Sequence, residues 1–471
     1  MNDLDRSLVE VAADLAAGRV SSVELTRAAL ARAHALQPAL NCFISIDDDT
    51  ALAEARAADT ARSAGRSLGS LHGVPLAHKD MYYRAGAISS CGSEVRRDFR
   101  PAITATVLER FHAAGAVTIG RLNMTEFALG PTGHNAIWGD CRNPWNNAHV
   151  PGGSSSGSGA SVAARIVYAS LGSDTGGSTR LPASANGATG IKPTHSLVSR
   201  HGVMGLSFSV DTPGPIARSA VDLARVLKVI AGHDPLDSTT SQLAVPDYEA
   251  LLPRSIAGLR IGVPTNYFFD AVDPAIADAI EAALAVLQSL GARRVPVQVP
   301  LAERLSELSR ALVYSEATAL HAHYLRTHAA DYSPQVRVRA STGLAIPAAT
   351  YVEALQLRSV LLRRFVEQVF GACDVLVAPT LAIPVPTLAE TGVGAGEAMW
   401  PIIARLVQCT APFNYLGVPA LSMPVGFDAR GLPIGMQLIG KPFAEARLLR
   451  VAAHYQTASD WHLRAPPLQY P

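Results

Sequence analysis

The sequence predicts an α/β protein in which helices are layered on a largely parallel or mixed sheet. Segments with helical periodicity alternate with short apolar strands along the chain. Apolar residues make up 48% of the 471 residues and charged residues 17%. This composition is typical of a globular protein with a substantial core, and the length allows one large domain or two to three ordinary ones.

The N-terminal region is expected to begin with two helices. Ser21 and Glu24 form a capping-box pattern, which opens a helix that continues to about Gln37. Residues 71–77 are apolar and carry turn residues, which predicts a strand that ends near Lys79. The neighbouring expected elements are helices at 51–64 and 104–114 and a strand at 116–119.

Residues 150–195 differ from the rest of the chain. Residues 151–159 carry too few side chains for an ordinary strand or helix, and 171–180 form a second loop rich in glycine and serine. The apolar stretch of small residues at 160–169 between the loops predicts a buried helix. A flexible linker would not contain such a stretch.

The C-terminal half continues the alternation of helices and strands. An amphipathic helix is expected at 274–290, directly before Gly291, and a further helix is expected at 302–329. Residues 385–400 are expected to form a loop. Strands are expected at 259–263, 421–425 and 434–439.

Charge and motif content argue against several classes of function. The net charge of +1 gives no broad attraction to nucleic acid or acidic membranes. No apolar stretch is long enough to predict a membrane span, and the acidic start of the chain does not resemble a secretory signal. The five cysteines have no zinc or Cys-x-x-Cys spacing, which indicates reduced thiols in a cytoplasmic protein. We expect neither a metal nor a cofactor.

Lysine is rare in this chain. Of the 40 basic residues only Lys79, Lys192, Lys228 and Lys441 are lysines, which a coding bias toward arginine explains. A lysine kept in an apolar segment still stands out, because a lysine can lose its proton and an arginine cannot.

The two glycine-serine loops are open to several interpretations. They fit tight turns, or a phosphate cradle built from backbone N–H groups. A Walker-like pattern at 435–441 is followed by Pro442 where Ser or Thr should bind magnesium. The run 153–157 matches a nucleophile elbow, but no strand is expected before it.

A catalytic interpretation centres on the second loop. The run Thr175-Gly176-Gly177-Ser178 lacks two Cβ atoms, so consecutive N–H groups can converge on one negative oxygen. Ser178 is then a nucleophile that needs a base. Lys79 is a candidate, because burial lowers the pKa of a lysine. On the local sequence alone, a salt bridge between Lys79 and Asp80 is the stronger interpretation.

Several motifs in this chain stand out together, among them Gly73-Val74-Pro75-x-x-x-Lys79-Asp80, Gly152-Gly153-Ser154-Ser155-Ser156-Gly157-Ser158, Gly172-Ser173-Asp174-Thr175-Gly176-Gly177-Ser178-x-Arg180 and Gly190-x-Lys192-Pro193-Thr194. Through these motifs the chain resembles the amidase signature family over nearly its full length. One departure is Ser156, where many relatives have glycine.

The resemblance implies a three-layer α/β/α fold with a large mixed central sheet flanked by helices. It also implies a catalytic triad. Ser178 forms an acyl-enzyme with the amide, Ser154, typically in a cis peptide, relays the proton, and Lys79 is the base. Asp174 and Arg180 are expected to brace the loop, and Lys192 is expected to be structural. The oxyanion hole is expected from the backbone N–H groups of Thr175, Gly176, Gly177 and Ser178, and the substrate pocket from Leu129, Gly130, Pro131 and Thr132.

A single domain over residues 1–471 is expected from the resemblance. Its parts are N-terminal helices (1–65), the signature core (66–230), a helical part that sets specificity (231–400), and closing strands with a helix (401–471).

The resemblance implies an amide hydrolase that releases ammonia or an amine. We favour a stand-alone amidase over the glutaminase (A) subunit of a tRNA-dependent amidotransferase. Those subunits carry an Asp before Asn414 that binds the substrate's α-amino group, and residues 406–412 contain no acid here. A non-enzymatic relative would need a broken triad. We expect a small-molecule amide with a neutral, apolar acyl group as substrate, a monomer or homodimer, and neither nucleic acid nor membrane as a partner.

Overall fold

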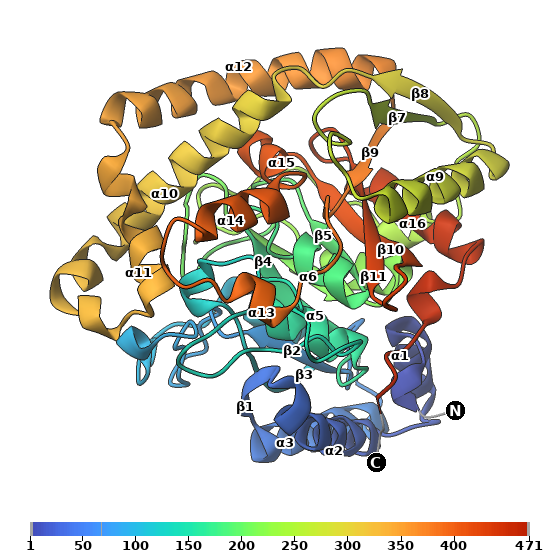
Figure 1. Cartoon of the computed structure of the whole chain (residues 1–471). Helices are drawn as coiled ribbons and strands as arrows, with labels where there is room; N and C mark the ends of the chain where they lie inside the picture. Colours follow the sequence, from blue (N-terminus) through green and yellow to red (C-terminus); the bar gives the residue numbers. More distant parts are fainter. Residues whose placement is uncertain (1–2, 67, 469–471) are drawn as a thin grey trace.

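An 11-stranded sheet runs through the molecule in the order β1-β3-β2-β4-β6-β5-β10-β11-β9-β7-β8 (Figure 1). The computed structural model describes residues 3–66 and 68–468. The strands are β1 (Phe43–Ile46), β2 (Pro75–Lys79), β3 (Val117–Leu122), β4 (Ala169–Asp174), β5 (Thr189–Lys192), β6 (Thr212–Ala217), β7 (Arg260–Pro264), β8 (Arg293–Val297), β9 (Val375–Pro379), β10 (Ala420–Phe427) and β11 (Pro433–Ile439).

The sheet is mixed, which confirms the predicted fold class. β2 is parallel to both β3 and β4, and β7 is parallel to both β8 and β9. The strands between these two groups pair antiparallel, from β4 through β6, β5, β10 and β11 to β9. Each of the four predicted parts of the chain contributes at least one strand to this one sheet. The boundaries between those parts stay a prediction.

Helices cover the sheet and extend beyond it (Figure 1). They are α1 (Leu8–Ala17), α2 (Ser22–Leu40), α3 (Asp48–Ser63), α4 (Thr106–Ala113), α5 (Ser156–Ala163), α6 (Arg180–Asn186), α7 (Ala220–Ile230), α8 (Tyr248–Leu251), α9 (Pro274–Ser289), α10 (Ala302–Thr327), α11 (Pro334–Ser341), α12 (Ala348–Ala372), α13 (Leu388–Thr391), α14 (Met399–Val407), α15 (Ala411–Leu416) and α16 (Glu445–Thr457).

Local sequence signals account for several helix ends. Ser21 caps α2, and its side chain and that of Glu24 form the reciprocal bonds of a capping box, as predicted. Asp273 caps α9, whose first residue is proline, and Gly291 follows that helix with a φ of +90°. These helices therefore begin where a side chain satisfies backbone N–H groups that a helix leaves unpaired.

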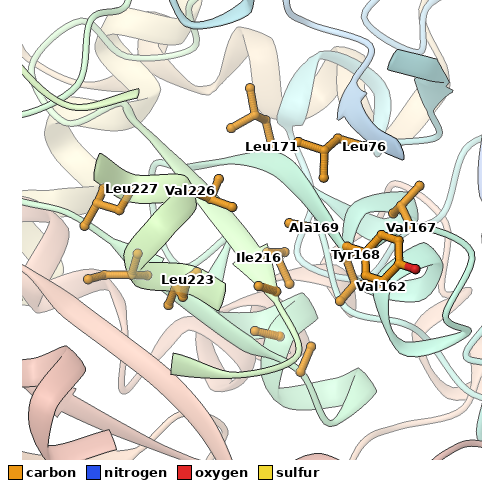
Figure 2. Packing of buried hydrophobic residues seen from close by; sticks show 14 of the residues in the cluster. Leu76, Val162, Val167, Tyr168, Ala169, Leu171, Ile216, Leu223, Val226 and Leu227 are labelled. Atoms are coloured by element: carbon orange, nitrogen blue, oxygen red, sulfur yellow. The ribbon is translucent and has the colours of Figure 1, made fainter. Parts of the chain in front are cut away.

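The core beside the site is built from small and branched apolar residues. Ala169 and Leu171 of β4 and Ile216 of β6 are fully buried. Figure 2 shows them packed between residues of α7, such as Leu223, and residues of α5, such as Val162. Burial of each such larger side chain contributes roughly 1.5–3 kcal/mol. This packing fixes the position of β4, whose C-terminal end leads into the second glycine-serine loop.

Two expectations about local structure are wrong. The predicted helix at 160–169 begins earlier, inside the first glycine-serine loop, and ends at Ala163. Residues 169–174 form β4, because they pair with β2 and β6. The predicted loop at 385–400 contains the short helix α13 and the first two residues of α14.

No helix in the described ranges is long and apolar enough to cross a membrane. All five cysteines lie within these ranges, where they are buried and form no disulfide.

Candidate active site

Lys79 is the last residue of β2 and is completely buried. Its Nζ donates hydrogen bonds to Ser154 Oγ and to Ser173 Oγ, each over 2.8 Å. Burial lowers the pKa of Lys79 to about 7, although the negative charges of Asp211 and Asp174 oppose this effect. A large share of the amine is therefore uncharged near neutral pH, and an uncharged amine accepts a proton.

The alternative of a Lys79–Asp80 salt bridge is wrong. Asp80 Oδ1 instead accepts a bond from Arg121 Nη1 at 2.5 Å, and Asp80 Oδ2 accepts one from Ser90 Oγ. Lys79 has no carboxylate within ion-pair distance in the described part of the chain. Its ammonium form therefore has no direct counter-ion.

The first glycine-serine loop places Ser154 beside Lys79. The peptide bond between Gly153 and Ser154 is cis. The Gly153 N–H donates to the carbonyl of Pro131 at 2.7 Å. A Cβ at Gly153 would lie 2.7 Å from the Gly130 carbonyl oxygen, and one at Gly157 would lie 2.2 Å from that of Cys42. Glycine is thus required at both positions by the close approach of neighbouring backbone.

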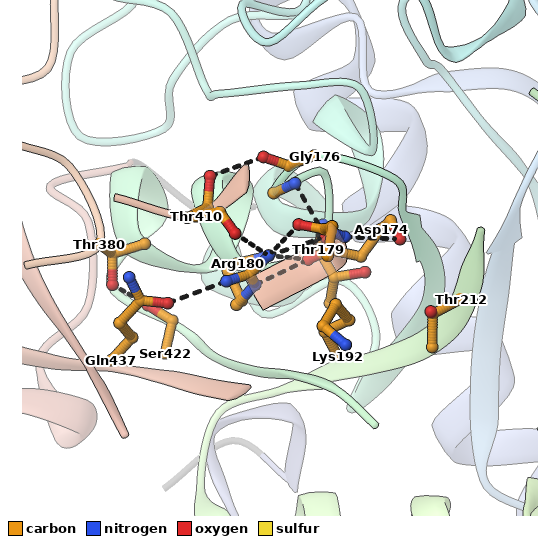
Figure 3. Close-up of polar contacts among 12 residues, drawn as sticks. Asp174, Gly176, Thr179, Arg180, Lys192, Thr212, Thr380, Thr410, Ser422 and Gln437 are labelled. Carbon is orange, nitrogen blue, oxygen red and sulfur yellow. Dashed lines mark hydrogen bonds and ion pairs between the residues drawn. The ribbon is translucent and has the colours of Figure 1, made fainter. Parts of the chain in front are cut away.

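A buried ion pair organises the second glycine-serine loop (Figure 3). Arg180 Nε and Asp174 Oδ2 lie 3.0 Å apart, and Arg180 Nη2 lies 3.0 Å from Asp174 Oδ1. Arg180 also donates to Gln437 Oε1 and Asn414 Oδ1. Burial raises the pKa of Asp174, but Arg180 outweighs it, and the pKa falls to about 2. The loop is therefore held by a charged pair whose members are both hydrogen-bonded further, as their burial demands.

Ser178 lies at the turn of this loop and is 9% exposed. The N–H of Ser155 donates to the carbonyl oxygen of Ser178 at 3.3 Å, so the two glycine-serine loops lie against each other. Within the described structure the hydroxyls of Ser154 and Ser178 form no hydrogen bond with each other. The structure thus bonds Lys79 directly to Ser154 and brings Ser178 alongside through the neighbouring backbone.

Of the four backbone N–H groups predicted for the oxyanion hole, one is already hydrogen-bonded within the protein. The N–H of Gly177 already donates to Asp174 Oδ1 at 2.8 Å. For the N–H groups of Thr175, Gly176 and Ser178, no acceptor occurs among residues 3–66 and 68–468. These three N–H groups are the ones left to bind a negative oxygen, because an oxyanion hole needs donors that are not already paired.

A cavity of about 180 Å³ opens next to Ser178. Its lining includes Thr175, Gly176 and the predicted pocket residues Leu129, Gly130 and Pro131, whereas Thr132, which was also predicted, does not line it. Most of the other walls are apolar and come from residues after 200: Leu206, Val313, Trp400, Ile403, Ala404, Val407 and Ala411.

Sequence reasoning missed the polar residues that line this cavity from the helical part of the chain. Arg339 of α11 is 6% exposed and donates to the carbonyl of Leu129 at 2.7 Å, while its Nε has no partner in the described structure. Tyr314 and Arg310 of α10 also line the cavity. Ser173, the second partner of Lys79, was likewise not singled out, although it lies inside the motif that contains Ser178. Arg339 carries no local motif signal, so only tertiary packing identifies it.

No group of three or more His, Cys, Asp or Glu side chains that could hold a metal ion occurs within the described ranges. The polar groups at the cavity are hydroxyls, backbone amides and guanidinium groups.

A family model described as amidase matches residues 24–449. The A subunit of the glutamyl-tRNA(Gln) amidotransferase of Chloroflexus aurantiacus is 42% identical over 99% of this chain and 100% of that protein. A solved vestigial protein complex, described as revealing the evolutionary origins of an s-triazine catabolic enzyme, contains a chain that is 36% identical, with a TM-score of 0.90 over 96% of this chain and 99% of that one. A peptide amidase bound to the inhibitor chymostatin is 33% identical, with a TM-score of 0.85 over 98% of this chain and 99% of that one.

Proposed function

The chain belongs to the amidase family and is an amide hydrolase, and from this premise we propose that it cleaves the C–N bond through an acyl-enzyme on Ser178. The observation that carries the proposal is the 2.8 Å bond from the completely buried Lys79 amine to the Ser154 hydroxyl. A buried amine without a counter-ion is a base, and a hydroxyl next to it can pass on a proton.

In this mechanism Ser178 Oγ attacks the amide carbonyl carbon. The proton of Ser178 moves to Ser154 Oγ while the proton of Ser154 moves to Lys79 Nζ. The Lys79 ammonium then returns a proton through Ser154 to the leaving nitrogen, and ammonia or an amine departs. Water attacks the acyl-enzyme by the same route in the second half, so the carboxylic acid leaves and Ser178 is restored.

The three free N–H groups of the second loop stabilise the negative oxygen of each tetrahedral intermediate in this proposal. They are those of Thr175, Gly176 and Ser178. They are held in place because the Asp174 carboxylate accepts a hydrogen bond from the Gly177 N–H and is itself paired with Arg180. Loss of one such donor typically lowers the rate about 10²–10³-fold.

Glutamine is the first candidate for the substrate, with this chain as the glutaminase (A) subunit of a tRNA-dependent amidotransferase. The full-length identity of 42% to a protein of that name supports this candidate more directly than it supports the stand-alone amidase that we favoured on sequence. Arg339 adds support, because a buried guanidinium at the cavity wall can bind the α-carboxylate of glutamine. This candidate requires partner subunits to receive the ammonia.

A stand-alone amidase is the second candidate, favoured by one specific observation. Among the described residues that line the cavity there is no aspartate or glutamate. Glutamine carries an α-ammonium group, and burial of a charge without a partner costs several kcal/mol. Val407 lies on the wall contributed by α14, in the stretch where the sequence lacks an acid. The mostly apolar lining fits an acyl group without an ammonium.

Ammonia release by the purified chain separates the two candidates. Glutamine, butyramide and succinamate would be compared at equal concentration, with the wild type and the Val407→Asp and Arg339→Met variants. If glutamine is the substrate, Arg339→Met lowers kcat/KM for glutamine roughly 10–100-fold and leaves butyramide unchanged, because glutamine offers a carboxylate and butyramide does not.

A stand-alone amidase gives the opposite pattern. The wild type then hydrolyses butyramide or succinamate without partners, and glutamine becomes a substrate only in Val407→Asp, which supplies the missing acid. Val313→Asp, also at the cavity, is the matched control for an acid introduced at another wall. The wild type hydrolysing no amide, alone or with amidotransferase partner subunits, would refute the proposed function.

A further inference from the structure

A second cavity, of about 260 Å³, reaches the surroundings of Lys79. It is lined by Ser173, whose hydroxyl accepts a bond from Lys79 Nζ, and by Asp211. Arg200, His201 and Asp237 are the other charged or titratable residues of its wall. None of these residues lines the cavity beside Ser178. A second set of polar residues, separate from those at the cavity beside Ser178, therefore lies near Lys79, the base of the proposed mechanism.

Asp211 connects the two cavities. Its Oδ1 accepts a 2.6 Å bond from Thr175 Oγ1, and its Oδ2 accepts bonds of 2.7 Å and 2.8 Å from the backbone N–H groups of Leu206 and Ser207. Thr175 and Leu206 both line the cavity beside Ser178. One carboxylate thus holds two parts of that wall, and Thr175 also carries one of the three free N–H groups.

The negative charge of Asp211 is less well compensated by nearby positive charge than that of Asp174. Asp174 is paired with Arg180, whereas Asp211 has no cation within ion-pair distance in the described part of the chain. Arg200 exerts a positive electrostatic influence on Asp211, but its guanidinium pairs with Asp237. The pKa of Asp211 is raised, because burial raises it and the hydrogen bonds to Asp211 and the charge of Arg200 offset only part of that rise.

Two further titratable groups that act on Asp211 or Lys79, the Cys91 thiol and the Tyr82 phenol, stay neutral at working pH. Burial raises the pKa of the Cys91 thiol to about 12, and the pKa of the Tyr82 phenol is raised by burial and by Asp211. Among the groups that act on Lys79, the two carboxylates Asp211 and Asp174 remain, and both favour its ammonium form.

We propose that Asp211 is a positioning residue: it fixes Thr175 and Leu206 at the reaction cavity, and its negative charge sets the pH range in which Lys79 acts as a base. This inference rests on the proposed function. The two effects can be separated, because the first depends on hydrogen bonds and the second on charge. Removal of the charge destabilises the Lys79 ammonium, so the amine becomes a base at lower pH.

The test is the rate of Ser178 modification by an alkyl fluorophosphonate, measured from pH 5 to pH 10. In Asp211→Asn we expect the acid limb of this profile to move to lower pH by on the order of one unit, with a lower plateau rate. Asp211→Glu keeps the charge, and its limb should stay in place. Thr175→Val should lower the plateau without moving the limb.

Asp237→Asn is the matched control, because Asp237 lines the same cavity but bonds to the Arg200 N–H and to Thr239. Its limb should stay at the wild-type position. If Asp211→Asn does not fold, Asp211→Ser removes the same charge and is measured instead. An unshifted limb in the charge-removing variant would overturn the inference. Absence of Ser178 labelling in the wild type would instead refute the proposed function.

Discussion

Lys79 and Lys192 are both completely buried, yet they lie in different surroundings. Burial lowers the pKa of each to about 7. Lys79 Nζ donates to two hydroxyls, whereas Lys192 Nζ donates to the backbone carbonyl of Pro193 at 3.1 Å. Figure 3 shows Lys192 near the Asp174–Arg180 pair. A carbonyl cannot pass on a proton and a hydroxyl can, so the partner, and not the lowered pKa, distinguishes a candidate base from a structural lysine.

The largest expected effect is the loss of activity when Lys79 is replaced. We expect Lys79→Met to lower kcat at pH 8 by about 10⁴-fold or more, because removal of one member of a catalytic triad removes most of its effect. Lys192→Met should stay within about tenfold of the wild type, because Lys192 has no hydroxyl to activate. The measurement is ammonia release, with circular dichroism to confirm that both variants fold. Equal losses of activity in the two variants would show that the hydrogen-bond partner does not distinguish the two lysines.

The smaller expected effect is on the pH dependence of the free energy of unfolding, to which both lysines contribute. Each has a pKa of about 7 in the fold and a reference value of 10.5. Between these values the unfolded chain binds more protons, so the free energy of unfolding rises with pH by roughly 1.4 kcal/mol per pH unit for each lysine. This stability is absent below about pH 7, where both states hold the proton.

Urea unfolding at pH 7.5, 8.5 and 9.5 measures that slope. Lys79→Met and Lys192→Met should each flatten it by a similar amount relative to the wild type, because either change removes one titrating group. A variant that keeps the wild-type slope would show that its lysine is charged in the fold at these pH values.

Local signals predicted much of the fold. The capping box at Ser21 and the Asp-Pro start of α9 specify helix ends through bonds within a few residues, so the sequence alone is enough to place them. β4 was missed because its sequence, Ala-Ser-Leu-Gly-Ser-Asp, lacks the β-branched and aromatic residues typical of strands. It is a strand because β2 and β6 lie on either side of it, which is a non-local cause.

The candidate site was predictable where its residues belong to motifs. Lys79, Ser154 and Ser178 lie in such motifs, and the structure brings the segments that carry them together. The cavity walls from α10, α11 and α14 were not predictable residue by residue, because long helices reach the cavity only through tertiary packing. Arg339, on which the choice of substrate depends, belongs to this group, whereas Val407 lies in the stretch 406–412 that the resemblance already linked to substrate binding.

The central claim is that Ser178 becomes a nucleophile because an uncharged Lys79 removes its proton through Ser154. Peptide mass mapping after reaction with an alkyl fluorophosphonate at pH 8 tests it most directly. We predict one phosphonyl adduct per chain, located on Ser178, and almost none in Lys79→Met under the same conditions. An adduct on another residue, or labelling of Ser178 at the wild-type rate in Lys79→Met, would contradict the account.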